Sequence, residues 1–344
     1  MRIAVVGAGA VGSVLGGCLA AGGHGVLLVG RTGPQRPIGG TLELWGPGNR
    51  RRSVPVTRVA SSAGLPQDLD AAILAVKRFD LPGAVDVLRD LPGLPAVTVQ
   101  NGIGAEELLL TRRPWSGLIA ASLTAAVELG AGGEARWLRR GGIGLAPVDG
   151  DVEAVAVALA DAFRAGGMPA VRMRDAASMK WSKLLTNLVG NATSALLDLD
   201  VGAIYADPQL YEIERRQLLE ALAVMGALGQ RPVALPGADV PLLVRVLRAP
   251  PVLGRPILAR VLGGARGGKM PSLRLALRAG PGPTEVAWLN GAVAEAAARA
   301  GIPAPVNAAL WRLVEDAAED PARRAWFVGR PERLVAALVA STAL

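Results

Sequence analysis

The chain has 344 residues and a formal net charge of +8, because 37 lysines and arginines outnumber 29 aspartates and glutamates. Hydrophobic residues make up 51% of it and charged residues 19%, a composition that allows two cored domains and excludes a disordered chain. The single cysteine, Cys18, excludes an intrachain disulfide, and with one histidine, His24, no metal site is expected. Glycine, proline, arginine or aspartate interrupts each apolar run before about 18 residues, so no membrane span is expected.

The positive charge raises the question of nucleic acid. The arginines are spread along the chain apart from the run Arg50, Arg51 and Arg52, and three phenylalanines with two tyrosines offer few surfaces for stacking bases. We therefore expect an anionic small molecule and no nucleic acid as partner. The opening MRIAVVGAGAVG has glycines in place of the leucine-rich segment of a signal peptide, so a cytoplasmic protein is expected.

The first elements along the chain predict a βαβ unit. RIAVV (residues 2–6) is typical of a strand and leads into the glycine turn GAGAVG (7–12). An Ala/Leu/Gly-rich segment up to about Gly23 predicts a helix, and VLLV (26–29) predicts a second strand. This order of elements indicates an α/β domain with a parallel sheet.

Gly7, Gly9 and Gly12 have the GxGxxG spacing of a dinucleotide-binding turn. The first glycine permits the tight turn, the second lets the backbone approach a pyrophosphate, and the third allows close helix packing. A glycine-rich structural turn is the alternative. The cofactor-binding residues expected in this turn are Gly7, Ala8, Gly9, Ala10, Val11 and Gly12.

The end of the second strand indicates which dinucleotide binds. An NAD enzyme has an aspartate or glutamate at this strand end, about 20 residues after the glycine turn, to hold the ribose hydroxyls. An NADP enzyme needs a cation there instead, to bind the 2′-phosphate. This chain has Gly30 and Arg31, and no acid before Glu43. Arg31 therefore favours NADP(H), and a solvated arginine is the alternative.

Two further parallel strands are expected at AAILAV (71–76) and AVTVQ (96–100), with a helix at LPGAVDVLRDL (81–91) between them. Lys77 follows the first of these strands and Asn101 the second. Ligands bind outside the carboxyl ends of parallel strands, so both side chains are expected near the nicotinamide. Ordinary loop residues are the alternative.

The pattern then changes twice. Strand-like pieces with GAGG and RRGG turns, between residues 117 and 147, predict hairpins that complete the first domain, and from about residue 175 the periodicity is helical. We expect an NADP-binding Rossmann domain at residues 1–172 and an all-helical substrate domain at residues 173–344.

Three features punctuate the helical domain. RAPPVLGRPILAR is expected to be a loop or broken helices, and GPGP (280–283) a turn. A long helix is expected from near Thr284 to Gly301, where a glycine suits the C-cap and Pro303 follows.

KWSKLLTNLVGNATSAL (180–196) predicts one buried helix with a polar stripe. Lys183, Asn187 and Asn191 recur every fourth residue between apolar flanks, with Lys180 close to their line. A helix with one wet side is the simplest alternative. A ketone under reduction develops negative charge on its oxygen, which an ammonium stabilises and protonates, so Lys180 and Lys183 are both candidate acids.

The order of these motifs resembles the ketopantoate reductases (2-dehydropantoate 2-reductases). The resemblance rests on GAGAVG, Arg31, AVK with Lys77, QNGIG with Asn101, KWSKLLTN with Lys183 and Asn187, Asn191, and PTEVAWLNG with Glu285. It implies a Rossmann domain, a helical domain with the C-terminal arrangement of 6-phosphogluconate dehydrogenases, and a cleft between them.

The same resemblance implies roles for single residues. Lys183 would protonate the carbonyl oxygen as hydride arrives, and Asn187 and Asn191 would hold the substrate. Glu285 would contact the substrate and the lysine, and it is expected in both the substrate-binding and the cofactor-binding sets. Only the match of the motif prefers Lys183 to Lys180.

Two segments depart from the family pattern. An asparagine before a glycine usually follows the two asparagines in these enzymes, and here Val201 precedes Gly202. Ser272 resembles the family's substrate-binding serine, but the run after it lacks the family's Gln and Asp. The Pro/Arg-rich stretch 231–270 is also larger than such enzymes need. Because these changes concern substrate recognition, a related 2-oxo acid or another ketone stays open.

The sequence therefore predicts an NADPH-dependent reductase of a 2-oxo acid, with ketopantoate as first candidate and pantothenate biosynthesis as the implied pathway. An opine or sugar-acid dehydrogenase of the same domain plan is the alternative among enzymes. A catalytically silent NADP-binding protein is the alternative outside them. A homodimer is one option for the assembly.

Overall fold

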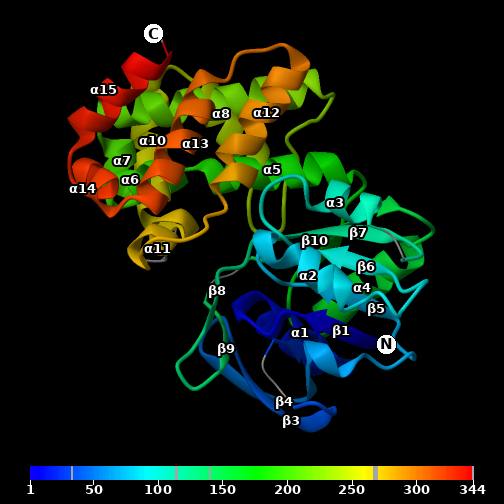
Figure 1. Ribbon diagram of the computed structural model, residues 1–344. Coiled ribbons are helices and arrows are strands. Elements are labelled where there is room, and N and C mark those ends of the chain that lie inside the picture. The colour runs from blue at the N-terminus through cyan, green and yellow to red at the C-terminus, as the bar shows by residue number, and fades with distance from the viewer. Residues whose placement is uncertain (32–33, 113–114, 139–140, 266–269, 343–344) are drawn as a thin grey trace. The chain divides into compact units, whose positions relative to one another are not determined.

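The computed structural model describes residues 1–31, 34–112, 115–138, 141–265 and 270–342 (Figure 1). The chain divides into two compact units. The first consists of Met1–Gln100, Gly104–Lys180 and Leu235–Ala238, and the second of Asn101–Ile103, Trp181–Ala234 and Asp239–Leu344. The division falls inside helix α5 (Ala176–Leu188) rather than between residues 172 and 173, and a continuous helix leaves no sequence signal at such a point.

A mixed sheet forms the first unit, and its described strands run in the order β11-β10-β7-β6-β5-β1-β2-β4-β3-β9-β8. From β7 to β4 all neighbours are parallel, as in a Rossmann domain. The strands are β1 (Arg2–Val6), β2 (Gly25–Gly30), β3 (Ile38–Gly46), β4 (Arg50–Ala60), β5 (Ala71–Leu74), β6 (Ala96–Thr98), β7 (Leu118–Leu123), β8 (Val127–Leu129), β9 (Ala135–Trp137), β10 (Ile143–Asp149) and β11 (Ala170–Arg172). The four parallel strands expected from the sequence are confirmed at β1, β2, β5 and β6.

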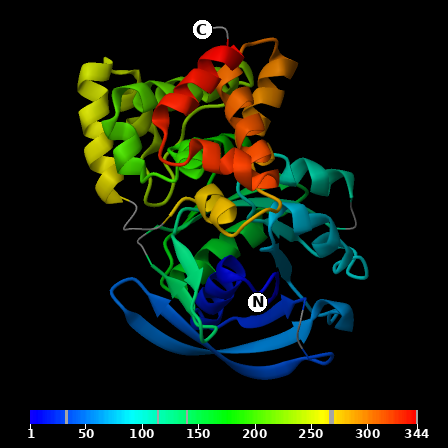
Figure 2. The same cartoon turned by 60° about the vertical axis from the view of Figure 1, so that its left-hand side comes forward.

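Strands β3 and β4 are not among the elements predicted from the sequence. They form a long antiparallel pair, visible as the two curved blue strands in Figure 2. Two glycines early in β3, and Pro55 with four arginines in β4, weaken the local strand signal. Pairing of β4 with β2 on its other side supplies the hydrogen bonds that override it. The expected hairpins between residues 117 and 147 are confirmed at β7 to β10, although Arg139 and Arg140 of the RRGG turn lie outside the described residues.

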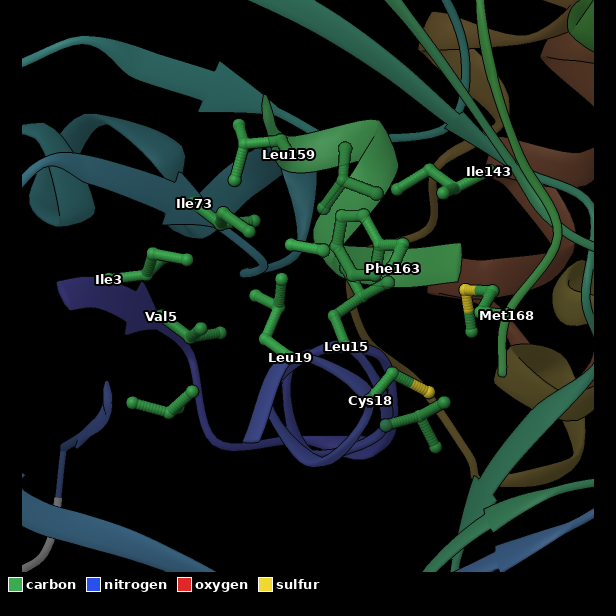
Figure 3. Packing of buried hydrophobic residues seen from close by; sticks show 14 of the residues in the cluster. Ile3, Val5, Leu15, Cys18, Leu19, Ile73, Ile143, Leu159, Phe163 and Met168 are labelled. Atoms are coloured by element: carbon green, nitrogen blue, oxygen red, sulfur yellow. The ribbon is translucent and has the colours of Figure 1, made fainter. Parts of the chain in front are cut away.

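Successive residues of β1 point to opposite faces of the sheet, and those from Ile3 to Val6 are all apolar. Helices cover both faces and bury them. Ile3 and Val5 pack with Leu15 of α1 (Ala10–Ala21) and Phe163 of α4 (Glu153–Ala165), all fully buried (Figure 3). Ala4 and Val6 pack on the other side, in a cluster that includes residues of α2 (Leu81–Asp86) and α3 (Ala105–Thr111). Burying each large apolar side chain stabilises the unit by about 1.5–3 kcal/mol. Helix α2 is shorter than the helix expected at 81–91.

All the regular secondary structure of the second unit, among its described residues, is helical, as expected. Its elements beyond α5 are α6 (Asn191–Leu197), α7 (Val201–Ala206), α8 (Pro208–Ala227), α9 (Val240–Arg248), α10 (Pro251–Ala265), α11 (Ser272–Arg278), the 3₁₀ turn η3 (Val286–Trp288), α12 (Asn290–Ala300), α13 (Pro305–Glu319), α14 (Pro321–Phe327) and α15 (Pro331–Thr342). No helix in the described ranges has the length and apolar content needed to cross a membrane.

Of the two alternatives expected for RAPPVLGRPILAR, the structure has broken helices: α9 ends at Arg248 and α10 begins at Pro251, where the missing N–H costs nothing. The break from α9 falls at Ala249 and Pro250. Helix α10 then continues through Pro256. One expectation for this unit needs correction. The helix expected from Thr284 begins only at Asn290, after η3, whereas its end at Gly301, with φ +68°, is confirmed.

Candidate active site

The glycine turn after β1 admits no side chain at two of its positions. Gly7 has φ +109°, and its N–H donates to the oxygen of Val29 at 2.8 Å. A Cβ on Gly7 would lie 2.8 Å from the backbone of Ala75, and a Cβ on Gly12 would lie 1.9 Å from the oxygen of Gly7. Since backbone atoms cannot give way, only glycine fits at either place.

The second glycine of the turn faces open space instead. A Cβ on Gly9 would have no atom within 4 Å, and Gly9 is the N-cap of α1 without a side-chain cap. The N–H groups of the first helical turn lack intrahelical partners and, with the helix dipole, attract an anion. Ala8 and Gly9 are exposed, and Ala10 and Val11 are half-buried. The turn therefore fits the pyrophosphate of a dinucleotide.

Two cations follow strands at this edge of the sheet. Arg31 follows β2, and its side chain is 89% exposed with Nη1 3.9 Å from Oδ1 of Asp80. Lys77 is exposed and precedes η2 (Arg78–Asp80), a short way beyond β5. Because β2 and β5 both run parallel to β1, their carboxyl ends lie on the same edge as the glycine turn. An exposed ion pair at this distance is weak, so its loss would cost little if Arg31 bound a ligand instead of Asp80.

Gln100, at the end of the β6 segment, ties the strand ends together. Its Nε2 donates to the oxygens of Leu74 and Val76 at 2.6 and 3.0 Å, across the end of β5. Its own backbone oxygen accepts from Nζ of Lys180 at 2.7 Å. Gln100 is not among the site residues expected from the sequence, although a polar residue at the end of the apolar run AVTVQ is a signal for it.

Lys180 belongs to a buried ion pair in the first unit. Its side chain is 5% exposed, and Nζ lies 3.0 Å from Oε1 of Glu106, which also accepts from the hydroxyl of Thr98 at 2.6 Å. Burial opposes ionisation of Glu106, but the Lys180 ammonium and these hydrogen bonds outweigh it and lower the pKa of this carboxyl. Lys180 therefore stabilises the first unit. The polar stripe in the sequence could not show this, because it places Lys180 and Lys183 on the same side of the helix.

The expected single helix from 180 to 196 is broken, so the polar stripe is not continuous. Helix α5 ends at Leu188, Gly190 has φ +59°, and α6 begins at Asn191. At this break, the N–H of Gly190 donates to Oε2 of Glu214 at 2.7 Å, so the side chain of Glu214 supplies its hydrogen-bond acceptor. A Cβ on Gly190 would lie 2.8 Å from Val201, so its backbone also allows this side chain to approach.

The middle of the QNGIG segment, Asn101–Ile103, belongs to the second unit and contacts α5 and η3 there. Asn187 Nδ2 donates to Oδ1 of Asn101 at 3.1 Å. The N–H of Ile103 donates to the oxygen of Trp288 at 3.1 Å, and a Cβ on Gly102 would lie 2.2 Å from that oxygen. Glycine at this position therefore permits the approach that brings Asn101 to Asn187.

Asn191 and Ser272 are also brought together. Asn191 is buried, its Oδ1 accepts from the N–H of Leu273 at 3.1 Å, and its Nδ2 lies 3.4 Å from the exposed Ser272 hydroxyl. The amide of Asn191 thus caps the first turn of α11 from outside that helix.

An arginine–aspartate cluster fixes α11 further along. Arg274, whose side chain is 7% exposed, donates to Oδ1 of Asp198 at 2.7 Å and to Oδ1 of Asp200 at 2.6 Å. Arg278 forms a second, bidentate pair with Asp198 at 2.8 and 2.9 Å. The Arg278 hydrogen bonds, followed by those of Arg274, lower the pKa of Asp198 to about 2 despite partial burial. The residues that depart from the family pattern after Ser272 therefore have partners of their own.

The remaining two site residues lie on the elements just described. Lys183 is half-buried on α5, one turn before Asn187. Glu285 is 7% exposed and directly precedes η3.

A cleft of about 570 Å³ lies elsewhere in the first unit. Its walls come from β3, β4, β9 and the turn after α4, and include Arg50, Arg52, Trp137 and Gly167. None of the residues of the glycine turn lines it, so it is separate from the cofactor residues.

Comparison with known proteins identifies the family of the chain. The profile of the family "Ketopantoate reductase PanE/ApbA" matches residues 3–150, and the profile of "Ketopantoate reductase PanE/ApbA C terminal" matches residues 175–318. A protein of Halobacterium salinarum named 2-dehydropantoate 2-reductase is 30% identical over 325 residues, covering 93% of this chain and 100% of the relative.

Solved structures give the same result for the fold. A PanE/ApbA family ketopantoate reductase from Ralstonia eutropha superposes with a TM-score of 0.74 at 26% identity, covering 94% of this chain and 100% of that one. A D-mandelate dehydrogenase, solved with NADH and anilino(oxo)acetate, has a TM-score of 0.75 at 20% identity and covers 95% and 99%, which shows a shared fold. With both profiles matched and a relative aligned over nearly its whole length, the chain belongs to the ketopantoate reductase family of oxidoreductases.

Proposed function

We propose that this enzyme reduces a 2-oxo acid with NADPH, most specifically 2-dehydropantoate to pantoate, with Lys183 as the proton donor. The family supports the reaction class, and the glycine turn with open space at Gly9 supports a dinucleotide. A basic protein favours an anionic substrate, which suits a carboxylate.

The different settings of the two lysines on α5 support Lys183 most directly. Lys180 is buried, and its ammonium binds the carboxylate of Glu106 and the backbone oxygen of Gln100. These contacts give it a structural role. Lys183 lies one turn before Asn187 and is half-buried. An ammonium within hydrogen-bond reach of the carbonyl oxygen stabilises the negative charge that develops there and delivers the proton.

The neighbouring polar groups are suited to holding the substrate. Asn187 and the exposed hydroxyl of Ser272 would bind its oxygens, and Glu285 would accept hydrogen bonds from the substrate and from Lys183. Asn191 would act through Ser272 and the start of α11, because its amide is bonded there.

The cofactor would be held by residues of the turn and the strand ends. The backbone from Gly7 to Gly12 would bind the pyrophosphate, and Arg31 the 2′-phosphate. Lys77, Asn101 and Glu285 are the further residues proposed to contact the cofactor. When bound, NADPH supplies the hydride for the carbonyl carbon.

Val201 bears on the choice of ketone. It is 5% exposed and lies against Gly190, so this position offers an apolar group where the family pattern has an asparagine. A site that lacks a partner for a substrate hydroxyl loses selectivity for it. We therefore expect a weaker preference for 2-dehydropantoate over its deoxy analogue than the family pattern implies.

Loss of NADPH absorbance with a panel of ketones tests the proposal. The panel contains 2-dehydropantoate, its deoxy analogue, benzoylformate, a sugar-acid ketone, and pyruvate with an amino acid as an opine precursor. The highest kcat/KM is expected for 2-dehydropantoate. Turnover of a different ketone alone would replace the substrate assignment, and NADPH binding without turnover of any ketone would contradict the proposal.

A further inference from the structure

Buried polar side chains follow one side of α8 in the helical unit. Glu214 and Gln217 are both 0% exposed and lie one turn apart, and Glu220 follows one turn later. Burying such groups costs free energy unless each finds hydrogen-bond partners. The partners of these three residues show which parts of the unit they hold in place.

Glu214 holds the break between α5 and α6. Its Oε2 accepts from the N–H of Gly190 at 2.7 Å and from the hydroxyl of Tyr205 at 3.0 Å. Burial raises the pKa of Glu214 despite the hydrogen bonds that it accepts. Because Gly190 lies between Asn187 and Asn191, this contact sets how the two asparagines are placed.

Gln217 links the same break to the segment after Glu285. Its Nε2 donates to the oxygen of Leu188, the last residue of α5, at 3.5 Å. Its Oε1 accepts from Nδ2 of Asn290, the first residue of α12, at 2.9 Å. One side chain thus reaches the end of α5 and the start of α12.

Glu220 and Asn307 complete the connection. Glu220 accepts from the N–H groups of Val306 and Asn307 at 2.9 Å each, which caps α13 from a neighbouring helix. Nδ2 of Asn307 donates to the oxygen of Gln217 at 2.9 Å, and Oδ1 of Asn307 accepts from Nδ2 of Asn290 at 3.0 Å. The start of α12 is therefore held from two sides.

We infer that Glu214, Gln217 and Asn290 are positioning residues that set the geometry of the substrate site. Their hydrogen bonds reach both segments on which the proposed function rests: the α5–α6 break, beside Asn187 and Asn191, and the start of α12, just after Glu285 and η3. They act through these segments, since all three side chains are buried inside the helical unit. The inference rests on the proposed function and extends it.

The effect of loosening this network follows from the precision that catalysis needs. A displacement of about 1 Å between reacting groups can lower the rate by about 100-fold, even when the changed residue lies away from the chemistry. The network should therefore affect kcat/KM for the ketone more than it affects NADPH binding, because the glycine turn belongs to the other unit.

Four variants of the full chain test this inference. Glu214→Ala removes both hydrogen bonds, and Glu214→Gln retains an oxygen that accepts from Gly190 and Tyr205. Tyr205→Phe removes only one of the hydrogen bonds to Glu214. It is a milder change, which tests the inference in case Glu214→Ala does not fold. Leu334→Ala, at a buried position of α15 outside the network, is the matched control for a lower melting temperature.

The measurements are kcat and KM for 2-dehydropantoate, the NADPH Kd from fluorescence, and the melting temperature. We expect kcat/KM to fall by about 10-fold to 100-fold in Glu214→Ala and less in Tyr205→Phe, with a smaller change in the NADPH Kd and most activity regained in Glu214→Gln. Leu334→Ala should lower the melting temperature and keep kcat/KM, measured where it is folded.

Two results separate the failures. An active wild-type enzyme whose Glu214 and Tyr205 variants keep kcat/KM, or lose it only as much as Leu334→Ala, would overturn this inference and leave the proposed function standing. A wild-type enzyme that reduces no 2-oxo acid would overturn the proposed function and this inference together.

Discussion

Lys180 and Lys183 show how burial gives two identical residue types different tasks. The two are close on the helical projection of α5, yet Lys180 is paired with Glu106 at 3.0 Å inside the first unit. Removing one partner of a buried ion pair leaves an uncompensated charge. Lys183, one turn before Asn187 on α5, carries the ammonium that we propose as the proton donor.

Single substitutions of these lysines should separate catalysis from stability. Lys183→Ala should lower kcat by about 100-fold or more, the scale of general-acid catalysis, and keep the NADPH Kd and the melting temperature. Lys180→Met should instead lower the free energy of unfolding by about 3–5 kcal/mol. Steady-state kinetics and urea denaturation of both variants check this. If Lys180→Met lost turnover while fully folded and Lys183→Ala did not, the roles would be reversed.

Arg31 should decide the preference between the two nicotinamide cofactors. A charged hydrogen bond to the 2′-phosphate is worth about 1.5–3 kcal/mol, so Arg31→Ala should raise KM for NADPH by roughly 10-fold to 100-fold. KM for NADH should stay nearly the same, because NADH has no phosphate there. Initial rates with both cofactors measure this, and equal use of NADH and NADPH by the wild-type enzyme is the result that contradicts it.

At the level of elements, the turn between β1 and α1 combines two kinds of glycine. Gly12 is required by the fold, since a Cβ would lie 1.9 Å from the oxygen of Gly7. A Cβ on Gly9 would point into open space, so the fold itself does not require glycine there. Glycine would be needed only for a ligand that approaches the N-terminus of α1. The sequence motif treats both glycines alike, and the structure distinguishes them.

Alanine substitutions should reveal this difference. Gly12→Ala should lower the melting temperature and abolish NADPH binding, whereas Gly9→Ala should keep the melting temperature and weaken NADPH binding by about 10-fold or more, because a methyl group would displace the pyrophosphate. Gly83→Ala, in α2 with nothing within 4 Å of its Cβ position, is the control and should change neither property adversely. Calorimetry and fluorescence titration give the two readouts. Unchanged NADPH affinity in Gly9→Ala would argue against this binding geometry.

For the whole molecule, the acid side of the stability profile should depend on Asp198. Its pKa is lowered from 3.8 to about 2, so its ion pairs contribute about 2 kcal/mol at neutral pH. The folded state binds the proton less readily than the unfolded state, so this stability is present above pH 3.8 and is lost as the pH falls to about 2.

Asp198→Asn should therefore destabilise the protein by about 2 kcal/mol at neutral pH, and the difference from wild type should shrink as the pH falls toward 2. Denaturation curves across this range measure the effect. Asp207→Asn, at the half-buried N-cap of α8, is a matched control that lacks the two arginine partners. A difference between Asp198→Asn and wild type that persists at low pH would show that the ion pairs are not its source.

Much of the architecture follows from local patterns. A β-branched run, a glycine turn and an apolar helix dictate β1, the turn and α1, because each depends on residues close in sequence. The helical periodicity beyond residue 175 likewise predicts a helical second unit. These are the parts for which backbone preference and apolar spacing agree.

Other features depend on partners distant in the chain, which local patterns do not contain. The β3–β4 pair forms despite glycines, a proline and arginines, because β2 supplies an edge to pair with. The expected helix from 180 to 196 breaks at Gly190, because Glu214, 24 residues further on, accepts its N–H. A left-handed glycine is unremarkable in sequence until such a partner is known.

The sequence by itself determined the family, the βαβ start and the helical character of the second unit, because these rest on spacing and chemical identity. It also supplied the candidate residues for reducing a ketone. The tertiary structure decided that Lys180 is buried beside Glu106, that Asn187 meets Asn101, that Asn191 caps α11, and that α8 carries a buried polar network. The physical reason is that burial and hydrogen-bond partners are properties of residues brought together by folding, which no single stretch of sequence encodes.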